Sequence, residues 1–294
     1  GPGAMGFAGE IHNGADDNAS GASGVLELAE YFVAHPTTRP IIFATFSAEE
    51  AGLLGSKALA NGKELPIANI RAMINLDMIG RSVKRYLFVG GMGTAREFHK
   101  RLDPLLEASP FKIEVSDQGE APSDNTSFYE VGIPSLFFFT NVHDDYHLPT
   151  DDADKIEYEA EIGILELVRD IAIEINDGEG AFSFKKAPGM GMPKDFWKRN
   201  MDHMRLVQKR TQNRGKFGMG VEVMEDGRIS VNKVSSAAKT ARVKVGDVLL
   251  TVNERAIASI DDLRRAMAGG MKGDAITLTV SRKGKTKSLK GKLK

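Results

Sequence analysis

The 294-residue sequence contains no cysteine, which excludes disulfide bonds, thiolate metal sites and a cysteine nucleophile. Any bound metal ion must therefore be held by carboxylates and imidazoles. No apolar run approaches the ~20 residues that span a bilayer, and the first residues lack the basic and apolar regions of a signal peptide. With 41% hydrophobic and 27% charged residues, the composition is that of a globular protein with room for two domains.

The net charge of −1 hides two halves of opposite sign. Residues 1–180 contain 13 basic and 30 acidic side chains, a balance of −17, whereas residues 181–294 contain 26 and 10, a balance of +16. This asymmetry favours two domains. The acidic half suits a metal site and a cationic substrate amine, although solvated acidic faces would give the same balance.

Helical and strand patterns alternate through the first 175 residues. Apolar residues at helical spacing predict helices over residues 18–34, 50–60, 94–107 and 157–175. Short apolar runs predict strands over residues 41–46, 71–76, 86–89 and 135–139. Because these strands are apolar throughout, we expect them to be buried between helices. The sequence thus predicts an α/β fold, a three-layer α/β/α sandwich with a largely parallel sheet.

Glycine and proline accumulate after residue 178 and mark a linker. We place a first domain at residues 1–178, a linker with a basic helix around Trp197 at 179–212, and a small β-rich domain at 213–294. In the last of these we expect one helix over residues 260–268. The expected strands are residues 220–224, 229–234, 248–252, 275–281 and 286–293.

Carboxylates and histidines gather in four segments, residues 13–21, 47–52, 75–78 and 147–151. Two of these segments directly follow predicted strands, and ligands bind at the carboxyl ends of strands in α/β sheets. Zinc takes imidazole and carboxylate ligands and leaves a position for water. An aspartate that bridges two ions could hold them ~3.5–4 Å apart. Glu49 and Glu50 are adjacent, so one could bind metal while its neighbour meets the water.

These segments, in this order, resemble the co-catalytic zinc aminopeptidases of peptidase clan MH. That clan includes bacterial leucyl aminopeptidases and relatives such as glutamate carboxypeptidases and glutaminyl cyclases. The resemblance implies that Glu49 is the general base and that Asp17 bridges two zinc ions. It further implies that Glu50 and His147 bind one zinc ion and Asp77 the other. We expect Asp16 to be structural, and we expect His143 and His203 to lie on the surface.

The chain also departs from the pattern of that family. Residues 123–134 resemble its substrate-pocket segment, but Asn125 stands in place of the usual histidine. The family's first ligand lies in a His-x-Asp motif well before the bridging aspartate, and His12 is too close to Asp17 to be that ligand. We therefore expect a peptidase domain that lacks its first strands. Two zinc ions are expected in the complete protein and one or none in this chain, and a missing N-terminal segment or another chain would complete the sheet.

The second domain resembles a PDZ domain of the kind attached to bacterial proteases. Gly246-Asp247, followed by an apolar strand, is the most specific element of this resemblance. The resemblance implies a carboxylate-binding loop formed by Phe217, Gly218, Met219 and Gly220, beside which a C-terminal peptide adds as a strand. A scaffold that binds nothing is the alternative. No aromatic platform accompanies the basic final hairpin, so we expect no nucleic-acid binding.

Together these observations predict a metalloprotease of the aminopeptidase class, a hydrolase that removes N-terminal residues from peptides by proteolysis. Two alternatives stay open: an inactive peptidase fragment that acts through its PDZ domain as a peptide-binding protein, and a single-zinc enzyme like glutaminyl cyclase. The PDZ domain argues against the second. The family resemblance suggests a secreted, periplasmic or cell-envelope location.

Overall fold

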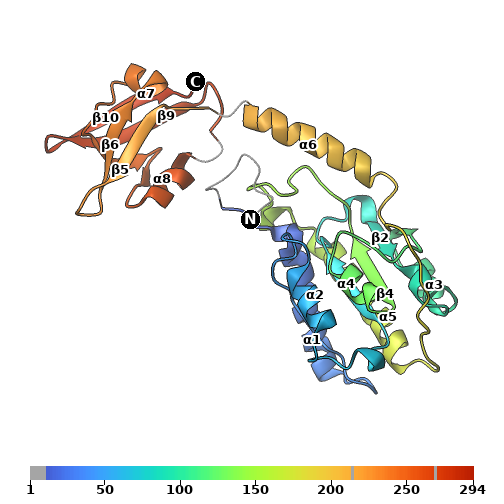
Figure 1. The fold of residues 1–294 in the computed structure, drawn as a ribbon. Coiled ribbons are helices and arrows are strands. Elements are labelled where there is room, and N and C mark those ends of the chain that lie inside the picture. Colours follow the sequence, from blue (N-terminus) through green and yellow to red (C-terminus); the bar gives the residue numbers. More distant parts are fainter. Residues whose placement is uncertain (1–10, 213–214, 268–269) are drawn as a thin grey trace. The chain divides into compact units, whose positions relative to one another are not determined.

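The computed structural model describes residues 11–212, 215–267 and 270–294 (Figure 1). The chain divides into two compact units, His12–His203 and Met204–Lys294, each of which has its own hydrophobic core. Helix α6 (Phe196–Gln212) contains the boundary between them and lies within the region where a basic helix was expected. Within the described ranges, no helix combines the length and the apolar character needed to cross a membrane.

The first unit is built on a four-stranded mixed sheet. Its strands are β1 (Met73–Asp77), β2 (Tyr86–Gly90), β3 (Lys112–Val115) and β4 (Ser135–Phe139), in the order β1-β4-β2-β3. The pairs β1/β4 and β2/β3 are parallel, as expected, whereas β2/β4 is antiparallel. Every residue of β4 is buried, in agreement with its apolar sequence.

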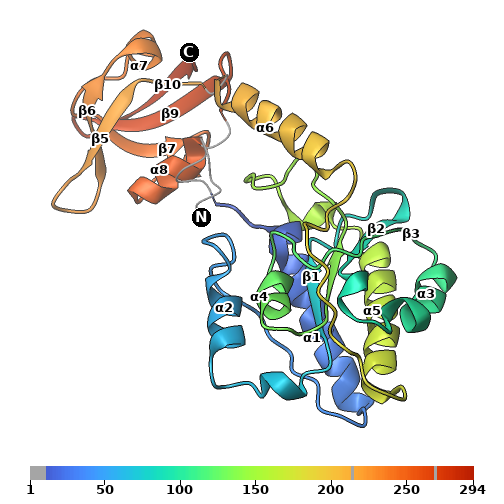
Figure 2. The same ribbon diagram turned by 45° about the vertical axis from the view of Figure 1, so that its right-hand side comes forward.

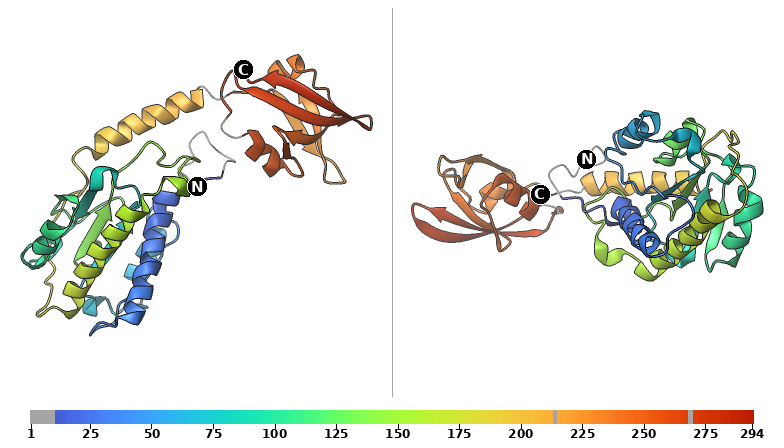
Figure 3. Two further views of the ribbon diagram at one scale, coloured as in Figure 1. Left: turned by 180° about the vertical axis from the view of Figure 1, so that it is seen from behind. Right: turned by 90° about the horizontal axis from the view of Figure 1, so that it is seen from below.

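Helices cover both faces of this sheet. On one face lie α1 (Gly21–Ala34), α3 (Phe98–Ala108) and α5 (Tyr158–Asp177), and α1 runs beside α5 (Figure 3, left). On the other face lie α2 (Leu54–Asn61), α4 (Asn125–Glu130) and the start of α6 (Figure 2). Alternate residues of β4 point to opposite layers: Leu136 and Phe138 join the first core, and Phe137 packs in the second with Phe196. The predicted three-layer α/β/α sandwich is confirmed.

The predicted buried strand at residues 41–46 is wrong. This segment is extended but unpaired, and its Ile42 and Phe43 side chains are 57% and 37% exposed. A strand needs a neighbouring backbone to accept its hydrogen bonds. In the part of the chain that the structure describes, no strand pairs with β1 on the side opposite β4, so residues 41–46 have no partner there.

The second unit is a mostly antiparallel β-domain. Its main sheet has the order β10-β9-β7-β6-β5, formed by β5 (Met219–Val223), β6 (Ile229–Val234), β7 (Val248–Val252), β9 (Ala275–Arg282) and β10 (Lys285–Lys292). A short strand, β8 (Arg255–Ala256), pairs with β7, and two helices complete the unit, α7 (Ser236–Thr240) and α8 (Ile260–Met267). All five predicted strands are present, within one residue at each end, and the predicted helix begins at residue 260 as expected, while its predicted last residue, 268, lies outside the described residues.

Candidate metal centre

Asn18 fixes the turn that carries Asp17 to the end of β1. The Asn18 amide donates to the carbonyl of Leu76 at 3.0 Å, and its oxygen accepts from the backbone N–H groups of Gly21 (3.0 Å) and Met78 (3.1 Å). Gly21 has no space for a side chain, because a Cβ there would lie 2.2 Å from the carbonyl oxygen of Leu76. This close approach places Asp17 beside the carboxyl end of β1, where Asp77 lies.

Three of the predicted ligands converge. The Nε2 atom of His147 lies 3.1 Å from Oδ2 of Asp17 and 2.8 Å from Oε1 of Glu50. One ligand atom from each of the three residues lies within 4.8 Å of the other two. Burial disfavours the imidazolium form of His147, but hydrogen bonds to Asp17 and Glu50 outweigh burial and raise its pKa to about 10. Two carboxylates and one imidazole are a donor set that fits zinc.

Asp77 lies outside this trio but beside it. Its Oδ2 accepts a 2.7 Å hydrogen bond from the hydroxyl of Ser123, which in turn accepts one of 2.6 Å from the Asn75 amide. Burial, followed by the negative charge of Asp17, raises the pKa of Asp77 well above its usual value. A second cation between Asp17 and Asp77 would relieve this repulsion.

Glu49 lines the same pocket as these carboxylates but is not part of the cluster formed by Asp17, Glu50 and His147. It lies on the turn before α2, where the N–H groups of Gly52 and Leu53 donate to its carbonyl at 2.9 and 2.8 Å. Burial, and then the charge of Glu50, raises the pKa of Glu49 to about 7. A carboxyl group with such a pKa exchanges protons readily at neutral pH.

Asp151 and Asp16 support the turn that contains Asp17. The carboxylate of Asp151 accepts from the backbone N–H groups of Asp16 and Asp17, at 3.0 and 3.1 Å. Asp16 is fully buried, and its Oδ2 lies 3.1 Å from Nε2 of His143. Asp16 is thus structural, as expected. The expectation that His143 lies on the loop surface is wrong, because its side chain is only 9% exposed.

His203 and Asn125 are both buried. The predicted surface position of His203 is wrong, because this residue is only 5% exposed. Its ring packs edge-on against Tyr146, and the Tyr146 ring in turn stacks on His147 at a centroid distance of 3.8 Å. Asn125 is buried, and its amide donates to the carbonyl of Gly119 at 3.1 Å. It thus holds a loop in place. No signal in the sequence distinguished these buried side chains from exposed ones.

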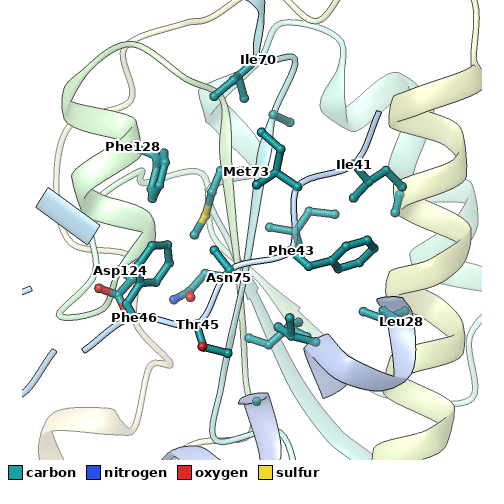
Figure 4. Close-up of a pocket in the computed structure, with 18 of the residues that line it drawn as sticks. Leu28, Ile41, Phe43, Thr45, Phe46, Ile70, Met73, Asn75, Asp124 and Phe128 are labelled. Atoms are coloured by element: carbon teal, nitrogen blue, oxygen red, sulfur yellow. The ribbon is translucent and has the colours of Figure 1, made fainter. Parts of the chain in front are cut away.

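A pocket of about 650 Å³ borders the candidate metal centre, and Figure 4 shows residues that line it. Most of its lining is apolar and comes from α1, β1, α5 and residues 41–46, including Phe32, Ile41, Phe43, Met73 and Val168. Its acidic lining gathers around the carboxyl end of β1 and consists of Asp17, Glu49, Glu50, Asp77 and Asp124. The candidate metal centre therefore borders a largely apolar cavity.

The predicted carboxylate-binding loop of the second unit is anchored through its carbonyls. The carbonyl of Phe217 accepts from the N–H of Ala238, and that of Gly218 from the N–H of Ser235, both at 2.7 Å. Gly218 has φ +77°, a conformation that favours glycine. Phe217 is buried, and β5 begins at Met219 as an edge strand of the sheet.

Comparison with known proteins agrees with both units. Residues 4–172 match Peptidase family M28, and residues 215–293 match the PDZ domain. Leucine aminopeptidase 1 of Grosmannia clavigera is 34% identical over 162 residues, which are 49% of this chain and 39% of the relative. Aminopeptidase YwaD of Bacillus subtilis is 34% identical over 158 residues, which are 50% of this chain and 34% of the relative.

Among solved structures, a zinc aminopeptidase from Bacillus subtilis matches with a TM-score of 0.51 and 28% identity, over 60% of this chain and 46% of that chain. The chain thus spans less than half the length of these relatives. The resemblances to zinc aminopeptidases and to PDZ domains are confirmed. The chain belongs to Peptidase family M28 and carries a PDZ domain behind its peptidase part.

Proposed function

We propose that the first unit belongs to a zinc aminopeptidase, which hydrolyses the peptide bond after the N-terminal residue of a peptide. The observation that carries this proposal is the convergence of Asp17, Glu50 and His147, with Glu49 and Asp77 around them. Such a donor set holds zinc and leaves a position for water. The family membership and the names of the relatives agree with this reaction.

In this proposal Asp17, Glu50 and His147 would hold one zinc ion, and Asp17 and Asp77 would hold a second. When bound, zinc supplies a Lewis acid for the scissile carbonyl and lowers the pKa of water. Glu49 takes a proton from the attacking water and delivers it to the leaving amine. Burial raises the pKa of Glu49 toward neutrality, which suits both halves of this transfer.

The test is Glu49→Gln in the zinc-loaded protein, assayed with leucine anilide and by metal analysis. We expect turnover to fall by about 10²- to 10⁴-fold, because general-base catalysis is lost, while zinc content stays unchanged. Glu107→Gln, an exposed change on α3, is the control and should leave both unchanged. Near-normal turnover in Glu49→Gln would disprove the role of Glu49 as the base.

We further propose that another polypeptide segment completes the sheet beside β1. The N–H of Met73 donates to Pro134 on the β4 side, so Ile74 and Leu76 direct their backbone groups to the opposite edge. The pocket lies along that edge, between β1 and the unpaired residues 41–46. An added strand would pair with both and bury Ile42 and Phe43.

Amide hydrogen exchange tests this second proposal. In the 294-residue chain alone, the Ile74 amide should exchange faster than the Met73 amide, which is bonded to β4. In the presence of a polypeptide segment that supplies the strand, the Ile74 amide should become as protected as that of Met73. Equally fast exchange of the Ile74 amide under all conditions would contradict the proposal.

For the second unit we propose that C-terminal peptides add as a strand to β5, with the terminal carboxylate at residues 217–220. The exposed edge of β5 and the left-handed Gly218 support this mode. Fluorescence anisotropy with labelled peptides should show that C-terminal amidation weakens binding. If carboxylate and amide peptides bind equally, residues 217–220 do not hold the terminal carboxylate; if neither peptide binds, this unit is a scaffold. If the second unit binds peptides while the first unit hydrolyses no substrate, the chain acts as a peptide-binding protein.

A further inference from the structure

The ring of His147 is oriented by stacking on a neighbouring ring. Histidines that bind metals almost always donate their second ring N–H to a carboxylate, a backbone carbonyl or water, which fixes the ring. Nε2 of His147 faces Asp17 and Glu50, and among the described residues no group hydrogen-bonds to its Nδ1. The ring instead stacks on that of Tyr146, with an angle of 26° between the two planes. The position of Tyr146 therefore restricts how the His147 ring can turn.

Helix α6 packs against Tyr146. The ring of His203, on this helix, meets that of Tyr146 at a centroid distance of 5.7 Å and an angle of 62°. Phe196 lies two helical turns earlier on the same face of α6 and is equally buried. Its ring packs against Phe139 of β4 at a centroid distance of 6.2 Å. One face of α6 thus packs on the sheet and, two turns later, supports the ring that stacks on His147.

A hydrogen bond at the start of α6 holds the loop that leads to His147. This loop follows β4, and its Asn141 is 2% exposed and has a left-handed backbone with φ +79°. The amide of Asn141 donates to Oδ1 of Asp195 at 2.7 Å, and Oδ2 of Asp195 accepts from Arg199. The loop is therefore held by the start of α6 at Asn141 and by a later turn of the helix at Tyr146.

We propose that His203 and Asp195 position His147 for metal binding. His203 restricts the ring of Tyr146, on which that of His147 stacks. Asp195 holds Asn141, which lies earlier in the same loop. Both are positioning residues, because neither belongs to the cluster of candidate ligands. This inference rests on the proposed metal centre.

The helix that supplies this support also joins the two units. α6 follows residues 4–172, the part of the chain that matches Peptidase family M28, and the boundary between the units falls directly after His203. The contacts that hold the loop all lie within the first unit. The helix that leads into the PDZ domain is therefore part of the structure that holds a metal ligand.

The first test compares three chains that differ in the ring at position 203. His203→Ala deletes the ring that packs on Tyr146 and should weaken zinc binding by about 10- to 100-fold, as expected when a group that orients a metal ligand is lost. His203→Phe keeps an aromatic ring at this position and should restore most of the affinity. Zinc is titrated into each 294-residue chain against a chromophoric chelator, and urea denaturation of the metal-free chain gives the stability.

Leu102→Ala is the control for a general loss of stability. Leu102 lies on α3, is fully buried and belongs to the core of the first unit. Its truncation should lower the stability of the metal-free chain at least as much as His203→Ala does, because it leaves a cavity in the core. The folded Leu102→Ala chain should nevertheless bind zinc as tightly as the unmodified chain, whereas His203→Ala should not.

The second test changes a half-exposed side chain, so that the fold is kept. Asp195→Ala removes the acceptor of the Asn141 amide and should weaken zinc binding by about tenfold. Asp170→Ala on α5 is the matched control, since both carboxylates are about half exposed, 48% for Asp195 and 46% for Asp170, and both pair with an arginine. The control should leave zinc affinity unchanged.

Unchanged zinc affinity in His203→Ala and Asp195→Ala would overturn the proposal, and would mean that α6 contributes only to stability. An equal loss of affinity in Leu102→Ala would overturn it as well, and so would a loss in His203→Ala that His203→Phe does not restore. If the unmodified chain itself binds no zinc, the metal centre is refuted, and this inference with it. Zinc binding without turnover would count against the proposed reaction alone.

Discussion

The hydrogen bonds of Ser123 make a prediction about how Asp77 is held. Ser123 is 2% exposed, and its hydroxyl joins the Asn75 amide to the carboxylate of Asp77. Ser123→Ala removes both hydrogen bonds and leaves the buried Asn75 amide and Asp77 each without a partner. Unsatisfied buried groups cost about 1–3 kcal/mol of unfolding free energy. Loss of a hydrogen bond that orients a metal ligand weakens metal affinity by about 10- to 100-fold.

The assay is a zinc titration against a chromophoric chelator, combined with urea denaturation of the metal-free chain. Ser135→Ala is the matched control, since its hydroxyl is also fully buried and donates to a carbonyl, that of Ile133, at 2.9 Å. Both variants should lose stability, but only Ser123→Ala should lose zinc affinity. Equal zinc affinity in the two variants would refute the view that Ser123 positions Asp77 for a metal ion.

Three further predictions concern stability. Phe98→Ala should destabilise the first unit by about 3–5 kcal/mol in urea, because a fully buried ring is deleted from its core; a loss below 1 kcal/mol would contradict the core assignment. Asp247→Asn should lower the free energy of unfolding of the second unit by about 3 kcal/mol, since Arg282 donates two 2.6 Å hydrogen bonds to this buried carboxylate. The exposed change Asp226→Asn should lower it far less. Burial alone would raise the pKa of Asp247, but Arg282 lowers it, so the stabilisation by this ion pair should be present above about pH 4 and decline at lower pH. A difference in unfolding free energy between the unmodified chain and Asp247→Asn that stays constant from pH 7 to pH 3 would contradict the ion pair.

Much of the fold follows from local sequence patterns. The strand Ser135–Phe139 has the predicted bounds because a continuous apolar run follows a proline. The prediction for residues 41–46 failed because an apolar run shows only that a segment tends to be buried. Whether it pairs depends on a neighbour distant in the sequence. The short α4 (Asn125–Glu130) was missed because six mostly polar residues have no clear helical pattern.

The candidate site was only partly predictable for the same reason. The resemblance of four segments to a known peptidase family singled out Asp17, Glu50 and His147, and the structure brings these side chains together. The contacts of Ser123 and Asp151 could not be predicted, because the direction of a loop side chain depends on how distant elements pack. Both residues lie within motifs that the sequence identified, which was the only available signal.

The central claim is that Asp17, Glu50 and His147 bind a metal ion, and zinc calorimetry on the chelator-stripped chain tests it most directly. His147→Ala should remove the tightest zinc-binding event, because it deletes the one imidazole of the donor set. His99→Ala, which removes an exposed histidine beside Asp103 and Asp117, should leave that event unchanged. The same zinc affinity and stoichiometry in His147→Ala as in the unmodified chain would contradict the account.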